Sequence, residues 1–396
     1  MNSSLTEWLI AHYGREEMKR DTGLSRMREA LKDLLPELNQ KKILTIAGTN
    51  GKGETTLWLS RSLAHRSHCT WMSPHIERIT ERFRDENGEI SEEELKSLVE
   101  EAHQKVQENK YSLSFYEFLF HVFCLWARKK NPELLLLEVG LGGRLDAVNV
   151  FDADLLLVPS IARDHQEFLG NRYDLILREK LALLRKKTQL MTYFSSVYLQ
   201  EKTSEIVKAI GAEWIDLEKE WPERFFEFSF RNQLLARAAF LFLEGKPHSE
   251  LKKFIPTREF LEHRGEVSRE RGEWIFYGSH NVDGMRKLIQ FLQSGNYNFG
   301  RPPYDAVLVA FSRREPRDLR AMLKMLKASG LGEVIVTGFP HQKAADPVMM
   351  KELSGLEGIK FVDDPQDLIG NNEKVRTLVT GSYYFMGHVK SLLRGR

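Results

Sequence analysis

Residues Leu44-Thr-Ile-Ala-Gly-Thr-Asn-Gly-Lys-Gly-Glu-Thr-Thr56 decide the fold that the sequence predicts. The run from Ile43 to Ala47 is apolar and β-branched, which is typical of a buried parallel strand. Three glycines and Lys52 follow, and we expect a helix to begin at Glu54. Glycines allow several backbone N–H groups to converge, and both the helix N-terminus and the lysine add positive charge. An ordinary connection accounts for one glycine but not for three with a lysine, so we predict a loop that binds a polyphosphate.

Composition limits the classes of protein to which the chain can belong. Its 396 residues predict two or three domains, and a net charge of +2 with interspersed basic and acidic residues gives no support to nucleic-acid binding. Cys69 and Cys124 lie in helix-like or strand-like segments, so we expect two buried free thiols rather than a disulfide. The sequence has neither a long apolar run nor a signal peptide, which predicts a cytoplasmic protein without a membrane segment.

Apolar strands and amphipathic helices alternate along both halves of the chain. Continuous apolar runs at Leu134–Glu138 and Leu155–Val158 are typical of central parallel strands that are covered on both faces. The polar stretch from Lys246 to Pro256 is the expected boundary between domains at residues 1–256 and 257–396. We therefore predict an α/β protein with a mainly parallel sheet in a phosphate-loop N-terminal domain and a smaller, Rossmann-like α/β C-terminal domain.

The remaining elements are predicted from hydrophobic periodicity and capping signals. Helices are expected over residues 4–39, 91–109, 113–128, 173–186, 233–243, 282–292 and 319–327, with a last helix after residue 380. Further strands are expected over residues 69–72, 190–194, 274–277, 306–311, 333–337 and 376–380.

A second motif, Glu138-Val-Gly-Leu-Gly-Gly-Arg-Leu-Asp146, follows one of the apolar strands. Glu138 lies at the carboxyl end of that strand, where open α/β sheets bind their ligands. A carboxylate beside a phosphate loop suits Mg²⁺, which prefers oxygen ligands. The alternative is that Glu138 merely pairs with Arg144.

Two further residues of the N-terminal half have open interpretations. His165 follows the strand that ends at Val158, and its neutral ring nitrogen could bind a metal, although a lone histidine is more often structural. Lys180 lies on a predicted helix in Arg178-Glu-Lys180, and by itself this pattern favours a solvated, charged helix face.

The C-terminal half contains two candidate anion sites. His280 and Asn281 join a predicted strand to a predicted helix, where backbone N–H groups could bind an anion, although a plain turn is the alternative. Arg264 could be a guanidinium clamp or a surface residue. Because both halves contain such motifs, we expect a ligand in a cleft between the domains.

Together these motifs resemble the folylpolyglutamate synthase / dihydrofolate synthase family, within the Mur-ligase-like ATP-dependent amide ligases. The resemblance extends over nearly the whole chain, and its most specific parts are the phosphate loop and the 138–146 motif. It rests on Gly23-Leu-Ser-Arg26, Gly48-Thr-Asn-Gly-Lys-Gly53, Ser73-Pro-His75, Glu81-Arg82, Glu138–Asp146, Asp164-His165, Arg178-Glu-Lys180, His280-Asn281 and Gly381-Ser382.

The resemblance implies an ADP-forming ligase of folate biosynthesis and one-carbon metabolism. ATP would phosphorylate a carboxylate of a pteroyl substrate, and the amine of L-glutamate would then attack the acyl phosphate to give an amide. The N-terminal domain would bind ATP and Mg²⁺, and the C-terminal domain would be the glutamate-ligase domain. We expect small-molecule partners only and a monomeric protein.

The resemblance also implies roles for individual residues. Lys52, Glu138, His165 and Lys180 are the expected catalytic residues, and Lys180 matches the lysine that is carbamylated in the family. Glu138 and His165 would bind Mg²⁺, with Glu54 and Thr55 as further candidate ligands. The expected ATP-binding residues are Gly48, Thr49, Asn50, Gly51, Lys52, Gly53, Glu54, Thr55, Asn232, Arg264, His280 and Asn281, while Ser73, His75 and Arg82 are expected to flank the pterin and its glutamate tail.

The sequence departs from the family pattern at several positions. Glu54 replaces a serine whose hydroxyl binds Mg²⁺; it could bind the metal itself, or it could repel the triphosphate, and Thr55 could take the place of the serine. Tyr277 replaces an aspartate, Val148 a threonine and Ser229 a glutamine. The alternative function is therefore a divergent, non-catalytic nucleotide- or folate-binding protein, or a ligase for a different acid.

Overall fold

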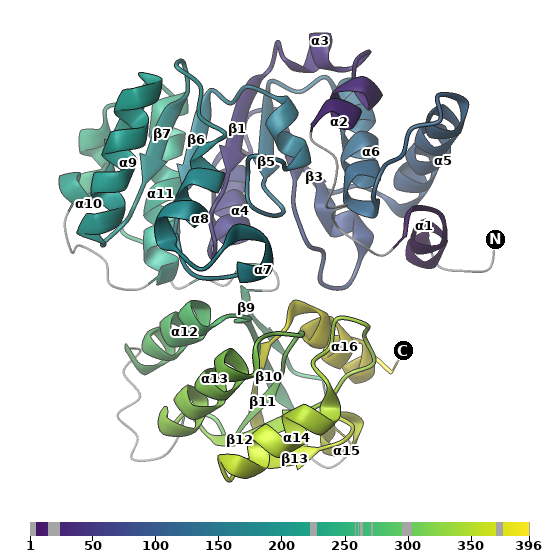
Figure 1. The fold of residues 1–396 in the computed structure, drawn as a ribbon, viewed down its shortest axis with the longest axis vertical. Coiled ribbons are helices and arrows are strands. Elements are labelled where there is room, and N and C mark those ends of the chain that lie inside the picture. The colour runs from purple at the N-terminus through teal and green to yellow at the C-terminus, as the bar shows by residue number, and fades with distance from the viewer. Residues whose placement is uncertain are drawn as a thin grey trace. The chain divides into compact units, whose positions relative to one another are not determined.

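The structure is a computed structural model that describes residues 5–14, 24–221, 228–257, 259, 261, 264–270, 272–294, 303–369 and 375–395. The chain divides into two compact units, one of residues 1–224 with 231–256 and the other of residues 225–230 with 257–396. Each unit is an α/β assembly around its own sheet (Figure 1). Among the residues that are described, no helix is long and apolar enough to cross a membrane.

The sheet of the first unit has eight strands in the order β4-β3-β2-β5-β1-β6-β7-β8. The central strand β1 pairs in parallel with β5 and β6, so the carboxyl ends of these three strands meet at one edge. The antiparallel pairs are β2–β3 and β3–β4. The strands are β1 (Lys42–Ile46), β2 (His68–Trp71), β3 (Phe83–Asp85), β4 (Gly88–Glu89), β5 (Leu134–Glu138), β6 (Leu155–Val158), β7 (Gln189–Thr192) and β8 (Glu213–Asp216).

Helices cover this sheet, and one of them, α6, packs against β2 and is buried along most of its length. The α-helices up to residue 256 are α1 (Leu5–Tyr13), α2 (Ser25–Ala30), α3 (Leu35–Leu38), α4 (Lys52–Ser62), α5 (Glu92–Glu108), α6 (Phe115–Lys130), α7 (Gln166–Leu169), α8 (Tyr173–Leu181), α9 (Val197–Ile210), α10 (Leu217–Glu220) and α11 (Phe228–Leu243). The 3₁₀ helices are η1 (Ile79–Arg82), η2 (Ala147–Val150) and η3 (His248–Lys253).

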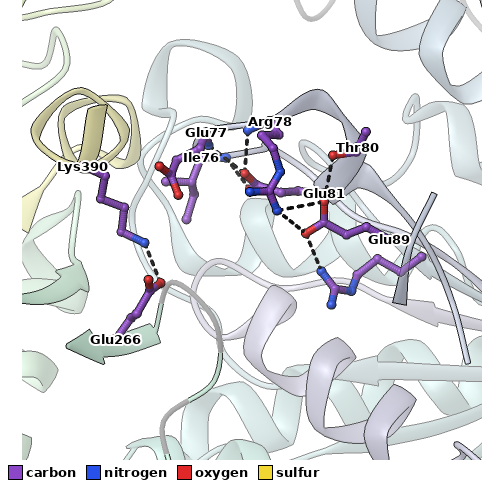
Figure 2. A network of polar contacts seen from close by, with 9 residues as sticks. Ile76, Glu77, Arg78, Thr80, Glu81, Glu89, Glu266 and Lys390 are labelled. Carbon is purple, nitrogen blue, oxygen red and sulfur yellow. Dashed lines mark hydrogen bonds and ion pairs between the residues drawn. The ribbon is translucent and has the colours of Figure 1, made fainter. Parts of the chain in front are cut away.

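The sheet of the second unit has six strands in the order β13-β12-β11-β14-β10-β9, with β9 antiparallel to β10. Helices α12 and α13 pack side by side, and α16 lies against β10 and β14. A 2.5 Å ion pair between Lys390 and Glu266 joins α16 to β9 (Figure 2). The elements are β9 (Arg264–Ser268), β10 (Glu273–Gly278), β11 (Ala306–Ala310), β12 (Glu333–Thr337), β13 (Lys360–Val362), β14 (Arg376–Gly381), α12 (Val282–Ser294), α13 (Pro316–Ala328), α14 (Pro347–Leu356), α15 (Gln366–Ile369) and α16 (Tyr383–Leu393).

The predicted α/β class is confirmed, and several strands begin and end where the sequence places them. Strands β5, β6 and β12 have the expected bounds because each is a short apolar run that ends at a polar residue or a turn. Both cysteines are buried free thiols, as expected. Strands β3, β4, β8, β9 and β13 and helices α9 and α14 were not expected from the sequence.

Several boundaries predicted from the sequence differ from those in the structure, and α11, for example, begins at Phe228 rather than near Gln233. The helical region expected over residues 4–39 contains the separate helices α1, α2 and α3, with residues 15–23 outside the described part. Helix α8 ends at Leu181 rather than near residue 186, because Thr188 accepts the amide of Arg185 and holds a turn there. Helix α4 begins at Lys52 rather than Glu54, because Gly51 adopts the left-handed conformation (φ 88°) as its N-cap.

Candidate active site

The phosphate loop is fixed by hydrogen bonds to the segment that follows β6. The Asn50 amide donates to Ser160 Oγ (2.9 Å), and the Ser160 hydroxyl donates to the Asn50 carbonyl (2.8 Å). Thr49 Oγ1 is similarly placed between the carbonyl and the amide of Ala162 (3.1 and 2.9 Å). The side chain of Thr49 is buried in this contact, so its role is to shape the loop. The sequence alone did not indicate Ser160 or Ala162 as partners of the loop.

Lys52 brings a full positive charge to the loop. It is the first residue of α4, and its ammonium group donates to the carbonyls of Gly48 (3.2 Å) and Thr49 (3.4 Å). Gly53 and Glu54 complete the first helical turn, where the backbone N–H groups of a helix lack internal partners. The ammonium and the helix N-terminus together make this end of β1 suitable for an anion.

Helix α11 brings Asn232 to the first turn of α4. The buried amide of Asn232 donates a 2.6 Å hydrogen bond to the carboxylate of Glu54. The next residue, Thr55, is fully buried, and its hydroxyl has no hydrogen-bond partner among the residues that the structure describes. Two residues from distant parts of the sequence that were both expected at the nucleotide are therefore in contact.

Glu138 lies at the carboxyl end of β5 and is only 3% exposed. Its Oε2 atom accepts the backbone amide of Ser73 at 3.3 Å, which brings an expected acceptor-binding residue next to an expected metal ligand. The alternative pairing of Glu138 with Arg144 is wrong, because Arg144 forms its ion pair with Glu179 at 2.8 Å.

The glycine segment after Glu138 packs directly on helix α8. A Cβ atom on Gly143 would lie 2.6 Å from the Glu179 carbonyl oxygen, and the Arg144 amide donates to that oxygen at 2.9 Å. This contact fixes the end of α8 and so positions Lys180, which is 3% exposed. The interpretation of Lys180 as a solvated helix residue is therefore wrong.

The electrostatic environment of Lys180 favours the neutral amine. Burial lowers its pKa to about 7, and the positive charge of Lys52 acts in the same direction. The carboxylates of Asp164, Asp146 and Glu179 oppose this shift. At neutral pH a substantial fraction of Lys180 is therefore an uncharged nucleophile beside the phosphate loop.

His165 precedes α7 in a left-handed backbone conformation (φ 49°), which is uncommon for a residue other than glycine. Its side chain is 43% exposed, and its Nε2 atom lies 3.9 Å from Oδ1 of Asp164. Asp164 is buried and also accepts the His165 backbone amide at 2.9 Å. No role for Asp164 was expected from the sequence, but in the structure it is a buried carboxylate that acts on both His165 and Lys180.

The donor atoms near the loop suit a magnesium ion. Glu138 and Glu54 supply carboxylate oxygens, and Thr55 supplies a buried hydroxyl to which no described residue is hydrogen-bonded. In the described part of the chain, no group of three or more His, Cys, Asp or Glu residues could hold a metal by itself. A Mg²⁺ ion at this position would therefore depend on phosphate oxygens and water to complete its coordination, which is its usual behaviour.

The segment from Ser73 to Arg82 contains the expected acceptor-binding residues. Arg82 is 1% exposed, donates from Nε to Nδ1 of His75 (2.9 Å), and lies over the rings of Trp71 and Phe115 at 6.0 and 5.7 Å. This arrangement places a guanidinium against an aromatic surface, where a cation–π interaction stabilises it. His75 and Arg82 thus form one pair rather than two independent contacts.

The buried carboxylate of Glu81 shapes the loop between His75 and Arg82. It accepts the successive backbone amides of Ile76, Glu77 and Arg78 at 2.7, 2.8 and 2.6 Å (Figure 2). Burial raises the pKa of Glu81, and these hydrogen bonds oppose the shift.

The candidate residues of the C-terminal half belong to the second unit. Asn281 is buried, and its Oδ1 atom accepts the Gly284 amide at 2.7 Å, so its side chain caps α12. The ring of His280 lies 5.4 Å from the ring of Tyr383. Arg264 begins β9, and its side chain lies outside the described part.

Comparisons with known proteins agree with this architecture. No protein-family model matches the chain. The dihydrofolate synthase/folylpolyglutamate synthase of Bacillus subtilis is 23% identical over 427 aligned positions, which cover 96% of this chain and 97% of that protein. The protein of the same name from Escherichia coli is 35% identical over 188 positions, which cover 47% of this chain and 44% of that protein. The crystal structure of the bifunctional folylpolyglutamate synthase/dihydrofolate synthase of Yersinia pestis, complexed with AMPPNP and Mn ion, has the same fold, with a TM-score of 0.79, 23% identity and coverage of 99% of this chain and 98% of that chain.

Proposed function

We propose that the chain is a member of the dihydrofolate synthase/folylpolyglutamate synthase family and that it is an ATP-dependent ligase, which joins L-glutamate to a pteroyl substrate. The observation that carries this proposal is the phosphate loop at the end of β1, with Lys52 and the buried, low-pKa Lys180 beside it. A polyphosphate and a reactive anion are the ligands that such a site favours.

The reaction has two steps that the loop supports by positioning and by neutralising charge. An oxygen of the pteroyl carboxylate attacks the γ-phosphorus of ATP, which gives an acyl phosphate and ADP. The amine of L-glutamate then attacks the acyl carbon, phosphate leaves, and the amine loses a proton. The loop N–H groups and Lys52 hold the phosphates during the first step. Arg82 and His75, with Ser73, flank the acceptor.

A divalent metal belongs to this proposal as the partner of the triphosphate, because the related Yersinia pestis enzyme was crystallised with an ATP analogue and manganese. Glu138, His165 and Thr55 are the proposed ligands, with Glu54 as a fourth candidate. When bound, such an ion neutralises charge that develops on the transferred phosphoryl group. The buried Thr55 hydroxyl, which has no partner among the described residues, supports its place in this set.

Lys180 is proposed to be carbamylated. A neutral amine attacks CO₂, forms a carbamate C–N bond and releases one proton, and the lowered pKa keeps part of Lys180 in this reactive form. The product is an anion close enough to Lys52 to attract it. The modification therefore exchanges a repulsive pair of cations for an attractive ion pair.

The two predicted domains are proposed to have separate roles. Residues 1–256 would bind ATP, and residues 257–396 would be the glutamate-ligase domain. Asn232, Arg264, His280 and Asn281 are the proposed nucleotide contacts outside the loop. We place the protein in the cytoplasm and expect a monomer. Sedimentation of the purified protein tests the oligomeric state.

The function is tested by an acceptor screen. Purified protein is supplied with Mg²⁺, ATP, L-glutamate and either dihydropteroate or a folate, and ADP release is measured. We expect release that depends on both the acceptor and glutamate. Absence of ADP with every pteroyl acceptor would overturn the proposal.

A second function, nucleotide or folate binding without catalysis, is favoured by one observation: Glu54 places a carboxylate in the first turn of α4. Calorimetry separates the two functions. Binding of Mg·ATP and of a pteroyl compound without ADP release supports the second, whereas turnover excludes it.

A further inference from the structure

The hydroxyl of Tyr116 is the centre of a fully buried hydrogen-bond network. It donates to Oδ1 of Asp146 at 3.0 Å. It also accepts two hydrogen bonds, from Nε1 of Trp71 at 3.3 Å and from the backbone amide of Gly140 at 3.2 Å. One oxygen atom therefore joins the end of β2, the start of α6 and the segment that follows Glu138.

The backbone that follows Glu138 is held at three successive amides. The Val139 amide donates to the carbonyl of Ile46 on β1 at 3.0 Å. The Gly140 amide donates to Tyr116, and the Leu141 amide donates to Oδ2 of Asp146 at 3.0 Å. Two of these three contacts belong to the Tyr116 network, so the path of the chain beyond Glu138 depends on it.

Tyr116 is itself fixed by the N-terminus of α6. Ser114 and Glu117 form a capping box, in which the Glu117 amide donates to Ser114 Oγ and the Ser114 amide donates to the Glu117 carboxylate. Arg26 pairs with the same carboxylate at 2.7 Å. The ring of Trp71 contacts that of Tyr116 edge-on at 5.6 Å. The hydroxyl thus has a defined position before any ligand binds.

Burial raises the pKa of both Tyr116 and Asp146. Asp146 compensates with hydrogen bonds from Tyr116, from the Leu141 amide and from the Val148 amide at 3.1 Å. Both carboxylate oxygens of Asp146 accept hydrogen bonds from within the protein, so the role of Asp146 is to stabilise the segment that follows Glu138. Removal of the tyrosine hydroxyl would leave two N–H donors and a carboxylate short of a partner in a buried place.

We infer that Tyr116 is a positioning residue, which holds the Glu138 carboxylate and the Ser73 amide in register through Gly140, Asp146 and Trp71. Ser73 lies two residues beyond Trp71, and Glu138 lies two residues before Gly140, so both ends of the 3.3 Å contact between them are anchored to the same hydroxyl. The inference rests on the proposed function, because Glu138 is proposed there as a metal ligand.

The variant Tyr116→Phe tests the inference, since it keeps the ring and deletes only the hydroxyl. In the ligand-free protein, hydrogen exchange of peptides that cover residues 138–149 should accelerate by about 10-fold or more, while the strands β6 and β7 keep their protection. With AMPPNP present, the Kd for Mn²⁺ should rise by about 10-fold, and kcat should fall by about 10- to 100-fold with little change in the KM for L-glutamate.

Tyr13→Phe is the matched control. Tyr13 also packs on α6, stacked on Phe118, and its hydroxyl hydrogen-bonds to Nδ1 of His103 at 2.7 Å, away from the 138–146 segment. Tyr13→Phe deletes one hydrogen bond rather than three, so it should lower the unfolding midpoint less than Tyr116→Phe does, and it should leave Mn²⁺ binding unchanged. Equal exchange, Mn²⁺ affinity and kcat in Tyr116→Phe and wild type would overturn the inference. Failure of the wild type to bind Mn²⁺ and AMPPNP would instead count against the proposed function.

Discussion

The side-chain amide of Asn232 donates a 2.6 Å hydrogen bond to the carboxylate of Glu54, which joins α11 to the first turn of α4. This contact holds the Glu54 carboxylate next to the phosphate loop, whose other groups favour the binding of anions. Asn232 accommodates the carboxylate without neutralising it, because an amide carries no charge. The departure of Glu54 from the family pattern therefore has a structural partner within the chain.

Replacement of Glu54 by glutamine should tighten the binding of ATP in the absence of metal. The substitution retains the size of the side chain and removes a charge close to the triphosphate. Under water-like screening, this charge is worth about 1 kcal/mol, or a roughly 5-fold change in Kd. Calorimetry with ATP and a chelator measures the change. Glu93→Gln, in the exposed first turn of α5, is the control and should bind ATP like the wild type. Weaker metal-free binding by Glu54→Gln would show that the carboxylate does not repel the nucleotide.

Lys180→Met should abolish turnover and stabilise the ligand-free, unmodified protein. In the folded protein the pKa of Lys180 falls from 10.5 to about 7, so between these pH values the unfolded chain binds more protons and stability rises with pH. Below about pH 7 the folded protein contains a buried charge that costs up to about 5 kcal/mol, and methionine removes this cost.

Denaturant unfolding of CO₂-free wild type and Lys180→Met, at about pH 6 and pH 9, measures this effect, and ADP release measures turnover. The stability gain should be larger at the lower pH. The exposed variant Lys96→Met is the control, with wild-type turnover and stability at both pH values. A Lys180→Met protein that turns over normally would exclude a catalytic role for this lysine.

The phosphate loop was predictable because its strand, glycines and lysine are contiguous in the sequence, and contiguous patterns determine local structure. Its supports were not predictable in this way. Ser160 lies 110 residues from Asn50, and Asn232 lies 178 residues from Glu54. Such contacts depend on which strands and helices become neighbours, and hydrophobic periodicity does not specify this.

Lys180 shows the same limit for the chemistry of the site. Its local pattern of alternating charges is that of a surface helix, and its burial arises because Gly143 allows the backbone to pack against the end of α8. The sequence contained one signal for this contact, since paired glycines beyond a strand allow close approach of another element. The paired glycines predict a close contact at Gly143, but they do not predict that the partner is α8.

Gly143→Ala should therefore displace the end of α8. Its Cβ atom would lie 2.6 Å from the Glu179 carbonyl and 3.0 Å from Cα of Lys180, both of which are backbone atoms that cannot rotate away. We expect a loss of about 2 kcal/mol or more in the free energy of unfolding and a fall in kcat of more than about 10-fold. Gly355→Ala in α14 is the control: outside its own helix backbone, no atom of the described residues lies within 4 Å of the added methyl group, and this variant should be slightly more stable than the wild type. A Gly143→Ala protein with normal stability and turnover would show that α8 does not depend on this contact.

His121 makes the first unit sensitive to acid. It is buried within α6, and no atom in the described part of the chain is hydrogen-bonded to its Nδ1. Burial together with the charge of Lys105 lowers its pKa from 6.5 to about 4, and Glu101 opposes this shift. Because the pKa of His121 is lower in the folded protein, the unfolded chain binds a proton at this residue at a higher pH than the folded protein does. The neutral imidazole therefore contributes stability that is complete above about pH 6.5 and declines by up to about 3 kcal/mol as the pH falls to about 4.

His121→Phe should remove this component of the acid sensitivity while it fills a similar volume. Denaturant unfolding at a series of pH values between about 4 and 7 measures the slope of stability against pH, and we expect a smaller slope for His121→Phe than for the wild type. The partly stacked, exposed His12, replaced by glutamine, is the control and should leave the slope unchanged. Equal slopes in His121→Phe and wild type would contradict this prediction. They would mean that the folded protein protonates His121 without a loss of stability, because water or a structural rearrangement exposes the imidazole before the unit unfolds.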